Sequence, residues 1–141
     1  MTDDVIVKIG EVLRSIGIPC ASPENVKNVL SGVCVIGENP TWYHFMISIA
    51  DAYLKIIMLA PYAEEIQHDG IDGKFYERLA DVNMKVLNGN FNYDSSVKRL
   101  MYKWVLPVDS VRLDDKEMVK GLVLLPAAMI IKYKDFLVNK S

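Results

Sequence analysis

The stretch from Asn90 to Asp109, NFNYDSSVKRLMYKWVLPVD, predicts a β-hairpin and decides the fold class of this chain. Phe91 and Tyr93 alternate with polar residues, Asp94–Ser96 has the composition of a turn, and a longer alternating run ends at Pro107. The two faces of that run are Leu100, Tyr102, Trp104 and Leu106, and Arg99, Met101, Lys103 and Val105. We therefore expect two antiparallel strands with chemically different faces.

A second hairpin is predicted earlier in the chain. Trp42–Ala50 alternates between larger apolar and more polar residues, and Tyr53–Leu59 answers it after a tight turn at Asp51. A helix over 50–59 is the alternative, but the density of β-branched and aromatic residues favours strands. Val33–Ile36, with the sequence VCVI, predicts one further strand.

The segment from Pro19 to Gly32 permits two interpretations. Ser22 followed by Pro23 has the pattern of a helix N-cap and first turn, and Val26 begins a helical spacing of apolar residues. The β-branched strand pattern that follows competes with a helix here. We expect a turn or a short helix, and the choice between helix and loop stays open.

Three helices are predicted by apolar residues spaced three and four apart. The first spans Asp4–Ile16, and the second spans Phe75–Leu87 before Gly89. The third begins at a capping box in which Asp114 accepts a hydrogen bond from the backbone of Glu117. Its apolar side is formed by Met118, Val119, Leu122, Leu125, Met129, Tyr133, Phe136 and Leu137. Pro126 should kink this helix, because the ring displaces the carbonyl of residue 122.

The element order is therefore α-β-β-β-α-β-β-α, which predicts an α+β fold with a mainly antiparallel sheet of about five strands flanked by three helices. A chain of 141 residues is the usual size of one domain, so we expect a single domain over 1–141.

Composition limits the partners. The formal net charge of −2 gives no attraction to nucleic acid. The N-terminus carries two aspartates where a signal peptide carries positive charge, and the longest apolar run, Gly121–Ile131, is shorter than the ~18 residues of a membrane span. We expect a cytoplasmic protein that binds neither nucleic acid nor membrane.

No catalytic constellation is visible. Cys20 and Cys34 lack a CxxC pattern, and neither His44 nor His68 has a partner at ligand spacing. The loop HDGIDGK at 68–74 departs from both the phosphate-binding and the calcium-binding patterns. We expect no catalytic residue, metal or cofactor, and we expect the Asn83 amide to bond a nearby backbone.

Four segments carry a family resemblance. They are LADVN at 79–83, GNFNYD at 89–94, LMYKWVLP at 100–107 and VRLDDKEMVKGLVLL at 111–125. Together with the element order, they make the chain resemble the YbjN-like family of bacterial sensory transduction regulators. The resemblance implies the α+β fold of type III secretion chaperones, which commonly form homodimers.

One sheet face is richer in apolar residues than a solvent face should be. If Phe45, Ile47, Ile56, Tyr102 and Trp104 face the helices, the opposite face also carries Val105 beside the candidate residues. Those candidates for partner binding are His44, Met46, Ile57, Leu59, Met101 and Lys103. The alternative is that the last helix or a second subunit covers this face.

Two functional hypotheses follow. The first is a non-enzymatic protein-interaction module, chaperone-like or a regulatory adaptor, that binds a protein segment as a homodimer. The alternative is a small-ligand sensor whose pocket lies between the sheet and the last helix, lined by Trp104, Met129 and Tyr133.

Overall fold

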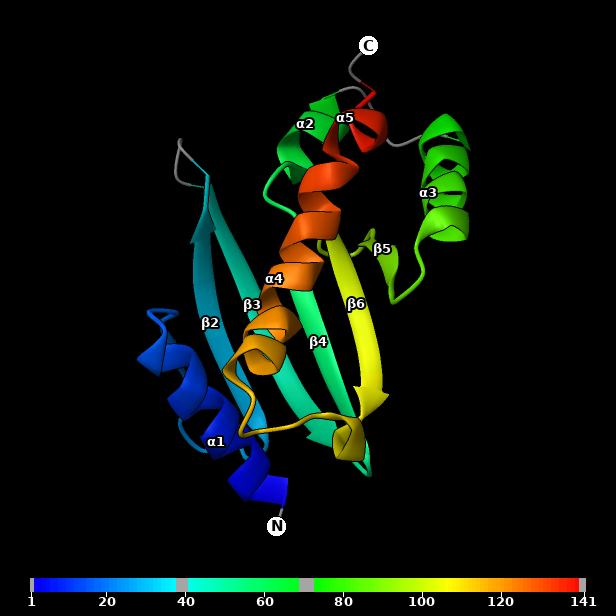
Figure 1. Ribbon diagram of the computed structural model, residues 1–141. Helices are drawn as coiled ribbons and strands as arrows, with labels where there is room; N and C mark the ends of the chain where they lie inside the picture. Colours follow the sequence, from blue (N-terminus) through cyan, green and yellow to red (C-terminus); the bar gives the residue numbers. More distant parts are fainter. Residues whose placement is uncertain (1, 38–40, 69–72, 140–141) are drawn as a thin grey trace.

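The computed structural model describes residues 2–37, 41–68 and 73–139, and it has the predicted α+β fold (Figure 1). The elements in chain order are α1 (Thr2–Ser15), β1 (Cys20–Ala21), β2 (Val29–Ile36), β3 (Thr41–Ala50), β4 (Tyr53–Leu59), α2 (Ala63–His68), α3 (Gly73–Lys85), β5 (Asn90–Asp94), β6 (Arg99–Pro107), a 3-10 turn (Val108–Ser110), α4 (Lys116–Lys132) and α5 (Lys134–Leu137). The strands form one six-stranded antiparallel sheet in the order β1-β2-β3-β4-β6-β5. Six strands replace the expected five because of the short β1.

The two predicted hairpins form the centre of the sheet and are confirmed. Asp51 takes the left-handed conformation, with φ 56°, at the turn between β3 and β4. The β5–β6 hairpin joins this unit through β6, which pairs with β4 so that Ile56 lies opposite Trp104. The two hairpins are therefore joined by antiparallel pairing between β4 and β6.

The segment before β2 is a turn and not a helix. Asn25 and Asn28 both adopt left-handed backbone conformations, with φ 65° and 61°, which a helix does not allow. After them β2 runs from Val29 to Ile36, four residues longer at its start than the predicted Val33–Ile36. Its full length pairs with β3, so the partner strand determines where it begins.

The helices differ from the prediction at their ends. The short α2 was not expected, and α3 ends at Lys85, which leaves Leu87 96% exposed although its spacing suits a buried helix position. The N-cap of α4 is Asp115 and not Asp114, and its carboxylate accepts a hydrogen bond of 3.2 Å from the Met118 N–H. The predicted N-cap was therefore wrong by one residue, because the two aspartates are adjacent.

The predicted kink at Pro126 does not break the last helix. The helix α4 runs through the proline without a break, and the chain leaves helical geometry at Tyr133, which separates α4 from α5. The side chains that α4 buries are Val119, Leu122, Val123, Pro126, Ala127 and Ile130. The proline is therefore part of the packed face of this helix.

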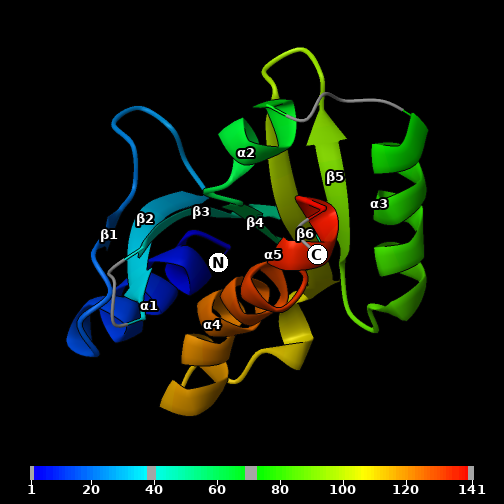
Figure 2. The same ribbon diagram turned by 90° about the horizontal axis from the view of Figure 1, so that it is seen from above.

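The main helices lie on one side of the sheet (Figure 2), where α1 and α4 cross β2, β3, β4 and β6. The helix α3 packs at the β5 end, and its Phe75 ring meets Tyr93 edge-on at 5.5 Å. Alternate strand residues point into this layer, among them Phe45, Ile47 and Ile56. One hydrophobic core thus lies between the helices and a single face of the sheet.

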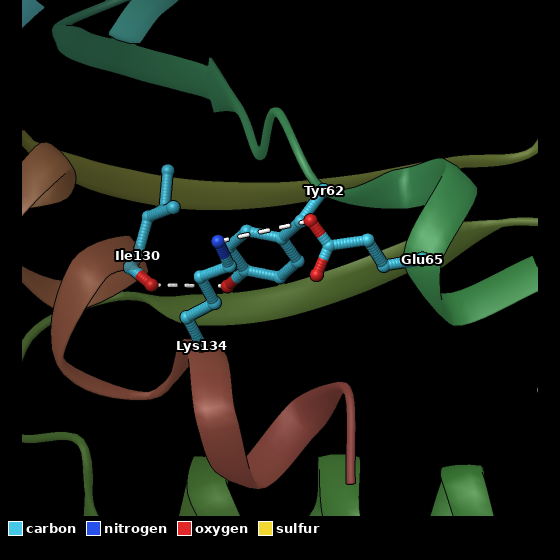
Figure 3. Close-up of polar contacts among 4 residues, drawn as sticks. All are labelled: Tyr62, Glu65, Ile130 and Lys134. Atoms are coloured by element: carbon cyan, nitrogen blue, oxygen red, sulfur yellow. Dashed lines mark hydrogen bonds and ion pairs between the residues drawn. The ribbon is translucent and has the colours of Figure 1, made fainter. Parts of the chain in front are cut away.

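A polar contact holds the C-terminal end of α4 against the α2 region (Figure 3). The buried Tyr62 hydroxyl donates a 3.0 Å hydrogen bond to the Ile130 carbonyl, one of the carbonyls that a helix end leaves without an intrahelical partner. Burial raises the pKa of Tyr62, so the hydroxyl stays protonated as a donor. Lys134 and Glu65 form an ion pair of 3.7 Å beside it, and its exposure makes the contribution small.

The Asn83 amide bonds backbone, as predicted. Its side chain donates to the Phe91 carbonyl at 2.9 Å and accepts from the Phe91 N–H at 2.7 Å. This pair of bonds imitates a neighbouring strand at the outer edge of β5, which attaches α3 to the sheet and blocks that part of the edge.

Gly32 gives a test of this packing. A β-carbon at this position would lie 2.5 Å from both the Pro19 carbonyl oxygen and the Phe45 ring. The position is where β1 pairs with β2, with Cys20 opposite Gly32. We expect Gly32→Ala to lower the free energy of unfolding by about 1–3 kcal/mol, because backbone has to move. Urea denaturation of the purified protein measures the change.

Gly121→Ala is the matched control. A β-carbon there has no atom within 4 Å and the position lies inside α4, so the same chemical change should raise the free energy of unfolding by about 0.5–1 kcal/mol. Equal effects of the two substitutions would contradict the close approach at Gly32.

Candidate functional site

The six residues predicted for partner binding lie together on the face of the sheet opposite α1 and α4. Across the strands, Met46 lies opposite Ile57, and Ile57 lies opposite Lys103. Leu59 lies opposite Met101 in the next row, and His44 is two residues from Met46 on the same side of β3. We call the surface formed by His44, Met46, Ile57, Leu59, Met101 and Lys103 the open face.

Side-chain exposure separates the two sides of the sheet clearly. Phe45 is 4% exposed and its neighbour Met46 is 38% exposed. Ile57, Leu59 and Met101 are half-buried. The last helix contacts β4 and β6 through the opposite side, where Leu54 and Ile56 are buried. Of the two alternatives for covering the open face, the last helix is therefore excluded, and a second subunit stays an untested alternative.

The centre of the open face is hollowed. A depression of about 230 Å³ is lined by His44, Phe45, Met46, Ile57 and Leu59. Its walls are almost wholly hydrocarbon, with the His44 imidazole at one side. A depression of this size and lining can receive one apolar side chain of a partner.

Four further apolar side chains outside the six candidates extend the open face, and Val105 among them was already expected on this face. Trp42, 60% exposed, lies opposite Val35, while Tyr53 and Val105 lie towards the other end of the strands. The alternation that predicted His44 and Met46 also places Trp42 on their side of β3. Strand pairing was needed to place Val35, because its neighbour across the sheet is not visible in sequence.

The charge on this side of the sheet is mainly positive. Lys55 and Lys103 lie diagonally on β4 and β6, and Arg99 begins β6. Asp94, opposite Arg99 in the β5–β6 register, is the acidic residue that the described strands place on this side. The open face therefore combines an apolar centre with a cationic border at β6.

Of the three residues predicted to line a ligand pocket, two line the same cavity. Met129 and Tyr133 line a cavity of about 190 Å³ between the end of α4 and the turn from α3 to β5. From β6 the cavity receives Tyr102, while Trp104, one step further along the same side of the strand, does not line it. The helical spacing of Met129 and Tyr133 was enough to predict them. Which residue of β6 lines the cavity depends on where α3 ends, and the sequence did not predict that end correctly.

Cys20 and Cys34 are free thiols, and His44 is the histidine whose side chain the structure describes. Cys20 donates through its thiol to the Gly10 carbonyl at 3.6 Å, and burial raises the pKa of Cys34 to about 11. His44 lies exposed on the open face, and the side chain of His68 and residues 69–72 lie outside the described part. Within the described ranges, no three His, Cys, Asp or Glu residues are placed to hold a metal ion. None of the helices described is long and apolar enough to cross a membrane.

Comparison with known proteins gives a fold likeness. No family model and no curated protein matches the sequence. A chain of the crystal structure of the ExsC–ExsE complex is similar over 100% of this chain and 98% of its own length, with a TM-score of 0.69 and 13% identity. A chain of the HopA1–SchA chaperone–effector complex is similar over 89% of this chain and 91% of its own, with a TM-score of 0.52 and 12% identity. The chain therefore has a fold found in structures of two-protein complexes, one of them a chaperone with its effector.

Proposed function

We propose that this chain is a non-enzymatic protein-interaction module, chaperone-like or a regulatory adaptor, that binds a segment of a partner protein on the open face. One observation carries the proposal. An apolar surface with a hollowed centre lies across β3, β4 and β6, and α1 and α4 pack on the other side of the sheet. Apolar patches of this kind on a soluble protein commonly mark binding surfaces.

The chemistry of the open face suits an extended or amphipathic segment. The unbranched side chains of Met46 and Met101 are flexible and carry a polarizable thioether, so they adapt to side chains of different shape. A partner side chain that enters the depression beside His44 would anchor the segment, and its neighbours would contact the adjacent strands. Lys55, Lys103 and Arg99 favour a segment with acidic residues beside its apolar ones.

The fold likeness supports this proposal. The HopA1–SchA structure is that of a chaperone with its effector, and the ExsC–ExsE structure also joins two proteins. The resemblance to the YbjN-like family adds a regulatory role, a homodimer and a cytoplasmic location to the proposal. We treat residues 1–141 as one interaction domain on the same basis.

The double substitution Met46→Glu with Met101→Glu tests the open face. Two carboxylates in the apolar centre would have to lose their water when a segment binds, and they would repel the acidic residues of that segment. We expect the cost to be several kcal/mol even with Arg99 and Lys103 beside position 101. We expect loss of capture of the partner by at least a hundredfold in affinity, with an unchanged circular dichroism spectrum. Binding of a partner that co-purifies with the wild-type protein, measured by calorimetry, gives the result.

Met84→Glu is the matched control. Met84 is 87% exposed and lies on α3, on the helical side of the sheet, so the same substitution there should leave affinity within twofold. Full-strength binding by the Met46→Glu, Met101→Glu protein, or a comparable loss with Met84→Glu, would contradict the proposed surface.

The homodimer is tested separately by light scattering of the purified protein. A single chain has a mass of 15.9 kDa, so we expect a mass of about twice that value that persists on tenfold dilution from micromolar concentration. A mass of one chain across that range would remove the dimer from the proposal and leave the open face untouched.

A further inference from the structure

The cavity beside the end of α4 is separate from the open face. It lies on the helical side of the sheet, and residues from three elements and one turn form it. Its lining residues are Lys85, Val86, Leu87, Asn88, Tyr102, Leu125, Met129, Lys132 and Tyr133. At about 190 Å³ it has room for a molecule with a single ring or a short chain, and Leu125 and Met129 give it an apolar wall.

One buried polar atom at this cavity lacks a partner. The Tyr102 hydroxyl is inaccessible to solvent and makes no hydrogen bond to any part of the chain that the structure describes, and the whole side chain is 0% exposed. Its ring is fixed by an edge-on contact with Phe91 at 5.1 Å and by the close approach of Gly89. A buried hydroxyl without a partner costs stability, so it points to a group that completes it.

The protonation of Tyr102 makes its hydroxyl a hydrogen-bond donor. Burial, and secondarily the nearby Tyr133, raise the pKa of Tyr102 to about 12. The hydroxyl therefore keeps its proton at neutral pH and can donate to an acceptor oxygen. This favours a ligand that carries an acceptor at the corresponding position.

The charged residues at the cavity are both cations. Lys85 comes from the end of α3 and Lys132 from the last turn of α4, and the residues that line the cavity include no Asp or Glu. Their ammonium groups lie over aromatic rings, Lys85 over Phe136 at 5.5 Å and Lys132 over Tyr133 at 5.3 Å. Because both lysines line the cavity, positive charge lies beside it, which attracts an anion.

We propose that this cavity binds a small monocarboxylic acid with a single-ring or short-chain apolar body. The carboxylate accepts a hydrogen bond from Tyr102 and is neutralised by Lys85 and Lys132. The apolar body lies against Leu125 and Met129. The proposal does not depend on partner binding at the open face, because the two surfaces lie on opposite sides of the sheet.

Methyl NMR of the full chain labelled at methionine tests the proposal with sodium benzoate as the probe. We expect the Met129 methyl signal to move saturably with a Kd below about 1 mM, while Met46 and Met101 on the open face stay unchanged. Benzyl alcohol and benzylamine, which keep the ring and lack the carboxylate, should bind at least tenfold more weakly. Absence of a Met129 shift, or equal binding of the three compounds, would overturn the proposal.

Tyr102→Phe separates a binding role from a structural one. Loss of the hydroxyl should raise the Kd for benzoate about five- to tenfold, and the melting temperature should stay the same or rise because an unpartnered buried polar atom is removed. Tyr53→Phe on the open face is the matched control and should leave the Kd unchanged. An unchanged Kd with Tyr102→Phe would refute the assigned hydrogen bond.

Discussion

The structure depends on a sheet that buries one face and leaves the other in contact with water. Strand residues alternate between the two sides, so the same strand supplies Phe45 to the core and Met46 to the surface. Because α1 and α4 pack on one side only, every second residue of β3, β4 and β6 is available outside the core. A register shift of one residue would exchange the two sides, so the buried layer also determines the composition of the open face.

Contacts at the edges of the helical layer keep this arrangement in place. Tyr62 holds the end of α4 through the Ile130 carbonyl, and Asn83 ties α3 to β5 through both polar groups of Phe91. The first contact involves Ile130, the residue after Met129, and the second involves Phe91, whose ring packs on Tyr102; Met129 and Tyr102 both line the cavity. The candidate ligand site therefore results from how the ends of α3 and α4 meet the sheet, whereas the candidate protein site results from the sheet alone.

The parts that the sequence predicts well are those with a strong local period. Alternation along 42–50, 53–59 and 99–107 was sufficient to place Met46, Ile57 and Met101 on one side, because a strand leaves no other choice. The sequence pattern was insufficient before β2. There, two asparagines with left-handed backbone conformations and the pairing with β3 determine where the strand starts. The sequence also could not choose between two adjacent aspartates for the N-cap of α4, where the hydrogen bond from the Met118 N–H identifies Asp115. Tyr102 and Trp104 share one side of β6, and of the two only Tyr102 lines the cavity that the end of α3 helps to form.

Methionine methyl NMR can show whether a partner segment binds on the open face. The wild-type chain carries reporters on the open face at Met46 and Met101, at the cavity at Met129 and on α3 at Met84. On addition of a partner protein that co-purifies with the chain, we expect the Met46 and Met101 signals to shift or broaden while the Met84 signal stays in place. A response confined to Met84 or Met129, with Met46 and Met101 unchanged at saturation, would contradict the account.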